Sequence, residues 1–199
     1  MADLEKTGKN LEGRGFRVHR FASGAEAAEF LVQTLHGTSI GIGGSVTIDT
    51  LGVYDRLCGS NEVFWHWKNH APETRERAGK AETYLCSANG VSENGEIVNI
   101  DGFGNRVAGT IYGPERVFLV VGRNKIAPDL NGAIDRARNI AAPLNARRLN
   151  RHTPCAVGEP RCHDCRSPEK VCGVMTVFFM PPTSIKEFHA ILVDEDLGY

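Results

Sequence analysis

The sequence predicts an α/β fold with a mostly parallel, layered sheet flanked by helices. Its strongest strand signal is the unbroken apolar run over residues 117–121, which is typical of a central parallel strand covered on both faces. Its strongest helix signal is residues 129–142, where Leu130, Ala133 and Ala137 fall on one face at helical spacing. Strand-like and helix-like segments alternate along the rest of the chain, and this alternation favours α/β layers.

Local signals predict the remaining elements. Ser23 and Glu26 form a capping box for a helix that runs to about residue 35, and Pro143 is expected to end the helix that begins at 129. Further helices are expected over residues 45–57 and 72–82. Short apolar or β-branched runs predict the other strands, over residues 39–42, 63–67, 84–87, 96–100, 107–112, 174–179 and 188–193.

Length and charge limit the class of protein. The 199 residues are expected to form one domain, 1–199, long enough to bury about 70% of its unfolded surface. A formal net charge of -1 gives no general attraction to nucleic acid or to anionic membranes. No apolar run approaches the roughly 20 residues of a membrane span, and the N-terminus lacks the apolar region of a secretory signal. We therefore expect a cytoplasmic protein.

A glycine-rich loop, G-I-G-G-S-V-T over residues 41–47, follows the predicted strand 39–42 and precedes a helix. Exposed backbone N–H groups and a helix N-terminus favour an anion at such a loop. The spacing does not match a dinucleotide-binding motif, because Val46 occupies the last glycine position, and a phosphate-loop lysine is absent. No nucleotide cofactor is predicted. The alternative is a tight strand-to-helix connection with no ligand.

A second loop, N-I-D-G-F-G-N-R over residues 99–106, brings Asp101, Asn105 and Arg106 together; the alternative is a plain hairpin turn at Asp101. Lys125 follows the central strand. The carboxyl ends of parallel strands meet at one sheet edge, so we expect both loops and Lys125 to form one site for a small anionic metabolite.

The expected roles in this site divide into binding and proton transfer. Glu93 and Asp101 are the candidate catalytic proton acceptors, although either fits equally well as a solvated turn carboxylate. The substrate-binding candidates are Gly43, Gly44, Ser45, Thr47, Asn105, Arg106 and Lys125.

Four cysteines lie in a compositionally distinct loop over residues 152–172. Cys155, Cys162, Cys165 and Cys172 have the spacing C-x6-C-x2-C-x6-C. Four thiolates suit tetrahedral Zn²⁺ or, alternatively, an iron–sulfur cluster. Two disulfides or four packed thiols are the other interpretations. The remaining cysteines, Cys58 and Cys86, are expected in the core.

Several motifs, in order, resemble the lactate-utilisation (LUD) domain family. They are G-I-G-G-S-V-T-I-D-T-L-G, S-A-N-G-V-S-E-N-G-E-I-V-N-I-D-G-F-G-N-R-V-A, G-P-E-R-V-F-L-V-V-G-R-N-K-I, R-A-R-N-I-A-A-P-L-N-A-R-R-L and T-P-C…C-H-D-C…C. The resemblance implies a stand-alone member with a fold similar to the ribose-phosphate isomerase and CoA-transferase superfamily. It also implies a component of L-lactate (2-hydroxy acid) utilisation that acts alongside iron–sulfur proteins.

Two other functions remain open at this point. One is a non-redox enzyme that acts on a phosphosugar or an acyl-CoA, as fold relatives do. The other is a non-catalytic assembly module stiffened by a metal in the cysteine loop. Whether the chain is catalytic on its own is left undecided by the sequence.

Overall fold

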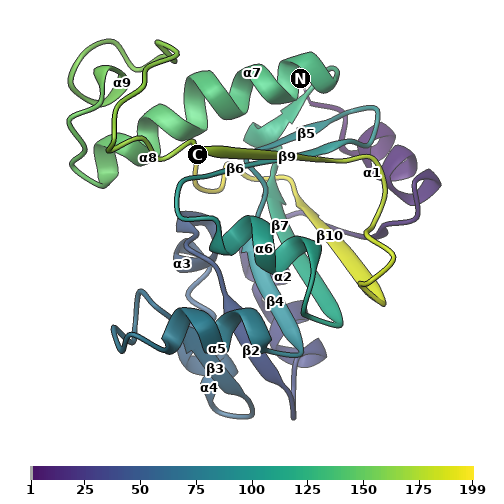
Figure 1. Ribbon diagram of the computed structural model, residues 1–199. Helices are drawn as coiled ribbons and strands as arrows, with labels where there is room; N and C mark the ends of the chain where they lie inside the picture. The colour runs from purple at the N-terminus through teal and green to yellow at the C-terminus, as the bar shows by residue number, and fades with distance from the viewer. Residues whose placement is uncertain (1) are drawn as a thin grey trace.

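The computed structural model describes residues 2–199. Its centre is a six-stranded sheet in the order β1-β10-β7-β4-β2-β3, in which every neighbouring pair is parallel (Figure 1). The strands are β1 (Arg17–Phe21), β2 (Ser39–Ile42), β3 (Glu62–Trp65), β4 (Thr83–Ser87), β7 (Arg116–Gly122) and β10 (Glu187–Val193). The predicted α/β fold with a parallel sheet is confirmed, and β7 lies inside the sheet as its apolar sequence predicts.

A second, mixed sheet was not predicted from the sequence. It has the order β8-β5-β6-β9, with antiparallel pairing of β5 with β6 and of β6 with β9. Its strands are β5 (Gly90–Ser92), β6 (Ile97–Asp101), β8 (Ile126–Ala127) and β9 (Val174–Phe178). Ile97 packs toward the six-stranded sheet, and Val98 packs on the opposite face against Ala133. The second sheet therefore forms a separate layer.

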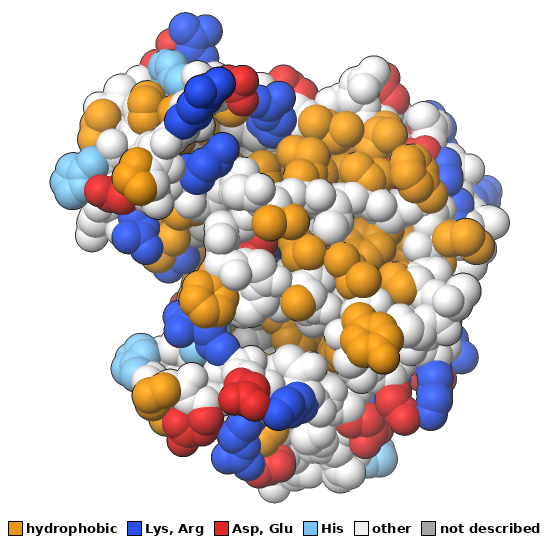
Figure 2. All heavy atoms as spheres, in the orientation of Figure 1, with side chains coloured by type: hydrophobic (Ala, Val, Ile, Leu, Met, Phe, Trp, Pro, Cys, Tyr) orange, Lys and Arg blue, Asp and Glu red, His pale blue; other side chains and the backbone are white. Residues whose placement is uncertain are grey.

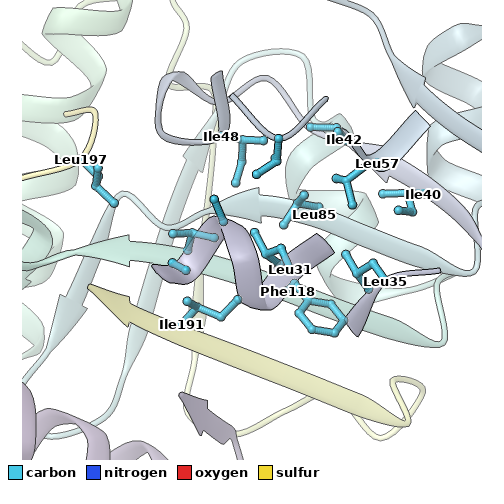
Figure 3. Packing of buried hydrophobic residues seen from close by; sticks show 14 of the residues in the cluster. Leu31, Leu35, Ile40, Ile42, Ile48, Leu57, Leu85, Phe118, Ile191 and Leu197 are labelled. Atoms are coloured by element: carbon cyan, nitrogen blue, oxygen red, sulfur yellow. The ribbon is translucent and has the colours of Figure 1, made fainter. Parts of the chain in front are cut away.

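Helices cover the outer faces of both sheets. They are α1 (Leu4–Gly13), α2 (Gly24–Thr34), α3 (Val46–Thr50), α4 (Tyr54–Cys58), α5 (Thr74–Lys80), α6 (Asn105–Ile111), α7 (Leu130–Arg136), α8 (Ala142–Arg148) and α9 (Pro154–Val157). On one face of the six-stranded sheet, Leu31 and Leu35 from the α2 region pack on Leu85, Phe118 and other strand residues (Figure 3). None of the helices in residues 2–199 combines the length and the apolar character needed to cross a membrane.

Capping contacts confirm one prediction of local structure, the start of α2, and correct another, the strand over residues 107–112. Ser23 accepts a hydrogen bond from the Glu26 N–H and begins α2, as the capping box predicts. The predicted strand over residues 107–112 is wrong, because this segment belongs to helix α6. The reason lies upstream: the Asp101 carboxylate accepts hydrogen bonds from the backbone N–H groups of Arg106 and Val107. This local cap outweighs the strand propensity of the β-branched residues.

Pro143 does not end the long helix, contrary to expectation. Helix α7 continues through a π-helical segment, Ala137–Ala141, directly into α8, which holds Pro143 in its first turn. Proline lacks an N–H and clashes with the carbonyl four residues earlier in a regular α-helix. The wider π turn removes that conflict locally, since its hydrogen bonds run five residues apart. The helix therefore reaches Arg148.

Two stacked histidines lie within the parallel sheet. His19 Nε2 on β1 is 2.9 Å from His189 Nδ1 on β10, and the His189 ring stacks on Phe118 at 4.1 Å between ring centres. Burial lowers the pKa of His189 to about 4, even though the Glu187 carboxylate, 3.3 Å from His189 Nε2, acts to raise it. Burial and the nearby Arg17 also lower the pKa of His19. Both rings are therefore neutral in the folded protein at neutral pH.

The buried His189 should make stability depend on pH. Its pKa is lower in the folded state than in the unfolded chain, so its contribution is complete above about pH 6.5 and is lost as the pH falls toward 4. Between pH 7 and 5, the free energy of unfolding should fall by about 1–2 kcal/mol more in the wild type than in His189→Gln. Urea titrations at both pH values measure this difference. The exposed His36→Gln control should keep the wild-type slope, and an unchanged slope in His189→Gln would contradict the assignment.

Candidate functional site

A cavity of about 850 Å³ opens at the carboxyl edge of the six-stranded sheet. Segments that follow β2, β4 and β7 line it, together with the end of β6, the start of α6 and helix α8. Figure 2 shows the molecule hollowed at its left edge, between the part that carries α8 and the part that carries α5, with Lys and Arg side chains on both sides of the hollow. The predicted position, beyond the strand ends, is therefore occupied by a real cavity.

Lys125 lines this cavity, and its side chain is a buried cationic group without a carboxylate partner. The residue is only 2% exposed. Its ammonium group donates hydrogen bonds to Thr47 Oγ1 at 2.7 Å and to Ser87 Oγ at 2.8 Å. Both hydroxyls donate in turn to backbone carbonyls. Burial lowers the pKa of Lys125 well below its ordinary value, and the nearby charges of Arg136 and Arg106 lower it further.

Two arginines stand close to Lys125. Arg106 donates from Nη2 to Asn89 Oδ1 at 2.8 Å and to the Ile100 carbonyl at 2.5 Å. Arg136 donates to the carbonyls of Asn124 and Asn89 at 2.7 and 2.5 Å, and burial lowers its pKa to about 10. Within residues 2–199, neither arginine forms a salt bridge with a carboxylate, and Lys125 does not either. Arg106 and Lys125 therefore line the cavity, with Arg136 close to Lys125 but outside the lining, and none of the three has an internal counter-charge.

The carboxylates that line the cavity have other partners. Asp49 pairs with Lys68 at 3.1 Å. The Asp101 oxygens accept three backbone N–H bonds from the loop and from α6, which is a capping role. Glu169 contacts His152. The lining contains seven Lys or Arg side chains and three Asp or Glu side chains, so the cavity as a whole favours an anion.

The glycine-rich loop over residues 41–47 uses some of its hydrogen-bonding groups within the protein, so not all of them are available to a ligand. The Gly43 N–H donates to the Leu85 carbonyl, and Ser45 Oγ accepts from the Ile48 N–H at the start of α3. A Cβ at Gly43 would lie 2.8 Å from Arg106 Cγ. Glycine at this position therefore makes room for the Arg106 side chain.

The structure brings most of the predicted site residues to the cavity. Those that line it are Gly44, Ser45, Thr47, Asp101, Asn105, Arg106 and Lys125. Gly43 lies behind Arg106 and outside the lining. Glu93 is placed elsewhere: its carboxylate binds Lys6 Nζ at 3.0 Å and the Asp3 N–H, and these contacts lower its pKa. Glu93 thus joins α1 to the turn after β5 and is not near the cavity residues.

Sequence reasoning missed the part of the lining around α8. There, Arg148 on α8 hydrogen-bonds the Tyr199 hydroxyl at 2.8 Å and Asn145 Oδ1, and it lies over the Trp67 ring at 4.6 Å. Asn145 and Arg148 do belong to a motif that carries the family resemblance, but the expected helix end at Pro143 concealed their place. No local signal pointed to Tyr199 or Trp67.

His66 is a further lining residue that the sequence did not single out. Burial and the neighbouring Arg75 lower its pKa to about 4, and its Nδ1 is buried without a hydrogen-bond partner among the described residues. The imidazole is neutral at neutral pH, and because Nδ1 is shielded from solvent, only Nε2 is left to exchange a hydrogen bond with a ligand.

The four loop cysteines surround a second, smaller cavity of about 230 Å³. All six cysteines of the chain are free thiols. Within residues 2–199, no group of three or more His, Cys, Asp or Glu side chains is arranged to hold a metal ion. Cys86 is buried as predicted, whereas Cys58 is exposed at the end of α4, so its predicted core position is wrong.

The capping role of Asp101 leads to a stability prediction. In Asp101→Asn, an amide NH₂ would face the N–H groups of Arg106 and Val107 or leave one of them unpaired. We expect the free energy of unfolding to fall by about 1 kcal/mol, measured by chemical denaturation. The exposed Asp55→Asn control should change it by less than about 0.5 kcal/mol. Equal stability of Asp101→Asn and wild type would exclude the cap as the main role of this carboxylate.

Comparisons with known proteins agree with this architecture. A crystal structure of a DUF162 family protein from Deinococcus radiodurans superposes with a TM-score of 0.56, over 96% of this chain and 95% of that one, at 14% sequence identity. No curated protein matches the sequence. The family model described as the LUD domain matches residues 4–193, which is nearly the whole chain. The chain therefore belongs to the LUD domain family, a family associated with lactate utilisation.

Proposed function

We propose that the protein binds a small organic acid anion, of the 2-hydroxy or 2-oxo acid class, in the cavity at the carboxyl edge of the sheet. The observation that carries the proposal is the buried ammonium of Lys125, which faces a cavity and has only hydroxyl partners. A bound carboxylate would supply the missing counter-charge, and the interaction is strong in a site that is partly shielded from water.

The distribution of polar groups suits a 2-hydroxy acid. Lys125 and Arg106 provide positive charge on one side of the cavity for the carboxylate, since a guanidinium and an ammonium both favour carboxylates. His66 and Asn145 are neutral hydrogen-bonding groups on other parts of the lining, suited to a hydroxyl or carbonyl oxygen. The site thus has separate groups for charge and for the second oxygen.

In this proposal the protein is a cytoplasmic component of L-lactate utilisation, and the electron-accepting chemistry belongs to partner iron–sulfur proteins. The association of the LUD domain family with lactate utilisation supports that context. Oxidation of a 2-hydroxy acid to a 2-oxo acid removes two electrons and two protons, and ordinary side chains do not accept electron pairs. The neutral His66 imidazole is suited to a hydrogen bond with the substrate hydroxyl, whereas its pKa of about 4 makes it a weak base at neutral pH.

The cavity volume favours a second candidate, a larger anion such as a phosphosugar or an acyl-CoA. About 850 Å³ is at the upper end of ordinary ligand pockets and exceeds what a three-carbon acid fills. Each carboxylate on the lining already has a partner, so a free glutamate or aspartate nucleophile is not among the described lining residues. The larger ligand would therefore be bound through its charge, without covalent catalysis by a carboxylate.

Ligand-dependent thermal stability separates these candidates. We expect L-lactate or pyruvate to raise the melting temperature of the wild-type protein, because a ligand that binds only the folded state stabilises it. Lys125→Met should weaken this binding at least tenfold, measured by calorimetry. The apo variant should be as stable as the wild type or more so, since it no longer buries an ammonium without a counter-ion.

The exposed Lys186→Met is the matched control and should bind like the wild type. Stabilisation by sugar phosphates or CoA esters, but not by 2-hydroxy or 2-oxo acids, would replace the leading proposal with the second candidate. Equal binding by Lys125→Met and wild type, or no stabilisation by any of these anions, would contradict an anion site at Lys125.

A further inference from the structure

The four cysteines of the loop meet at one place although Cys155 and Cys172 are 17 positions apart in the sequence. Cys155, Cys162, Cys165 and Cys172 are all half-buried and all line the same cavity of about 230 Å³. Residues 158–173 contain no helix or strand. A segment of this length has no regular structure and no apolar core of its own, so a cross-link would offset the entropy cost of ordering it. The common cavity identifies the cysteines as the candidates for that cross-link.

The central pair has local geometry that suits metal ligands. Asp164, between Cys162 and Cys165, has a left-handed backbone with φ of 48°, a conformation that aspartate tolerates better than most residues. The tight turn directs the Asp164 N–H to Cys162 Sγ at 3.4 Å. A backbone N–H donated to a cysteine sulfur orients that sulfur and stabilises it in the thiolate form, as outer hydrogen bonds do in metal sites.

Positive charge is available next to the sulfurs. Arg138, on the π-helical segment that follows α7, donates from Nη2 to Cys162 Sγ at 3.4 Å and also pairs with Asp164 at 3.1 Å. Lys170 lines the same cavity, and its ammonium contacts the Cys165 carbonyl at 3.4 Å. These cations offset part of the negative charge that four thiolates around a divalent ion would leave.

We propose that Cys155, Cys162, Cys165 and Cys172 bind one Zn²⁺ ion through their four sulfurs, because all four line one cavity around a turn that already donates to a sulfur. Binding replaces four thiol protons by the metal, [Zn(SR)₄]²⁻ forms, four protons are released, and no redox change occurs. The sulfurs must move inward to reach tetrahedral coordination, and the irregular loop is free to make that adjustment.

The metal-bound loop would have a structural consequence for the larger cavity. Lys170 and Val171 line both cavities, as do Ile100 and Ala142. The loop packs closely on the second glycine-rich segment, since a Cβ at Gly102 would lie 2.7 Å from Val171 Cα. A Zn²⁺ ion that fixes Cys165 and Cys172 would thus hold a wall of the anion cavity in place.

Metal analysis of the full-length protein tests the proposal directly. The wild type is purified under reducing, oxygen-free conditions, incubated with Zn²⁺ and desalted. We expect about one zinc per chain, and X-ray absorption should show four sulfurs at about 2.3 Å from the metal. Substitution of Co²⁺ should give the visible bands of tetrahedral cobalt with thiolate charge transfer. Cys162→Ser and Cys165→Ser should each lower the zinc content or affinity at least tenfold.

The exposed Cys58→Ser is the matched control and should retain full zinc content. Chelation should increase hydrogen exchange in residues 158–173 of the wild type and of Cys58→Ser, but not in Cys162→Ser. These readouts do not depend on any organic ligand, so they remain informative if the proposed anion binding fails. A zinc-free wild type, two disulfides in place of metal, iron with inorganic sulfide, or unchanged zinc in Cys162→Ser would each overturn the proposal.

Discussion

Burial of the Lys125 ammonium costs free energy that its two hydroxyl acceptors offset only in part. Arg106 and Arg136 increase this cost, because their charges lie nearby and also lack a carboxylate partner in the described chain. The lowered pKa of Lys125 reflects the same free-energy cost, because burial and the two arginines disfavour the charged lysine. An anion that enters the cavity would reduce this cost by stabilising the charged form. The cavity therefore attracts negative charge at the carboxyl ends of β4 and β7.

The parallel sheet makes this arrangement possible. In a parallel sheet the carboxyl ends of β2, β4 and β7 lie at one edge, so Thr47, Ser87 and Lys125 meet although they are far apart in sequence. The second sheet then supplies the other components of the site. Its strand β6 ends in Asp101, whose carboxylate begins α6 and thereby fixes the backbone of Arg106. Two layers that share one hydrophobic cluster thus contribute to one cavity.

The parts of this site that sequence could predict are those fixed by topology. A parallel sheet with polar or glycine-rich segments after its strands requires those segments to converge, and Lys125 followed from that rule. Arg106 reaches the cavity from β6 of the second sheet, which pairs antiparallel with β5 and β9, so its position does not follow from that rule. Glu93 shows the limit of this rule. Glu93 also follows a strand, but its carboxylate binds Lys6 on α1 and lies away from the cavity. Helix α6 was missed because its cap is Asp101, four residues before its first residue, and not a side chain at the usual N-cap position. Tyr199 and Trp67 approach the cavity only through tertiary packing.

The long helix α7–α8 connects the two cavities, and its π-helical segment determines what it presents to each. A π turn places one additional residue in the helix, which rotates everything after it by about 100° relative to an uninterrupted α-helix. Arg138 lies within this segment and contacts Cys162, whereas Arg148 follows it and contacts Tyr199 at the larger cavity. Pro143 stands directly after the wide turn that accommodates it. The irregularity that lets the helix continue past Pro143, against the sequence-based expectation, therefore separates the arginine that contacts the thiols from the one that lines the anion cavity.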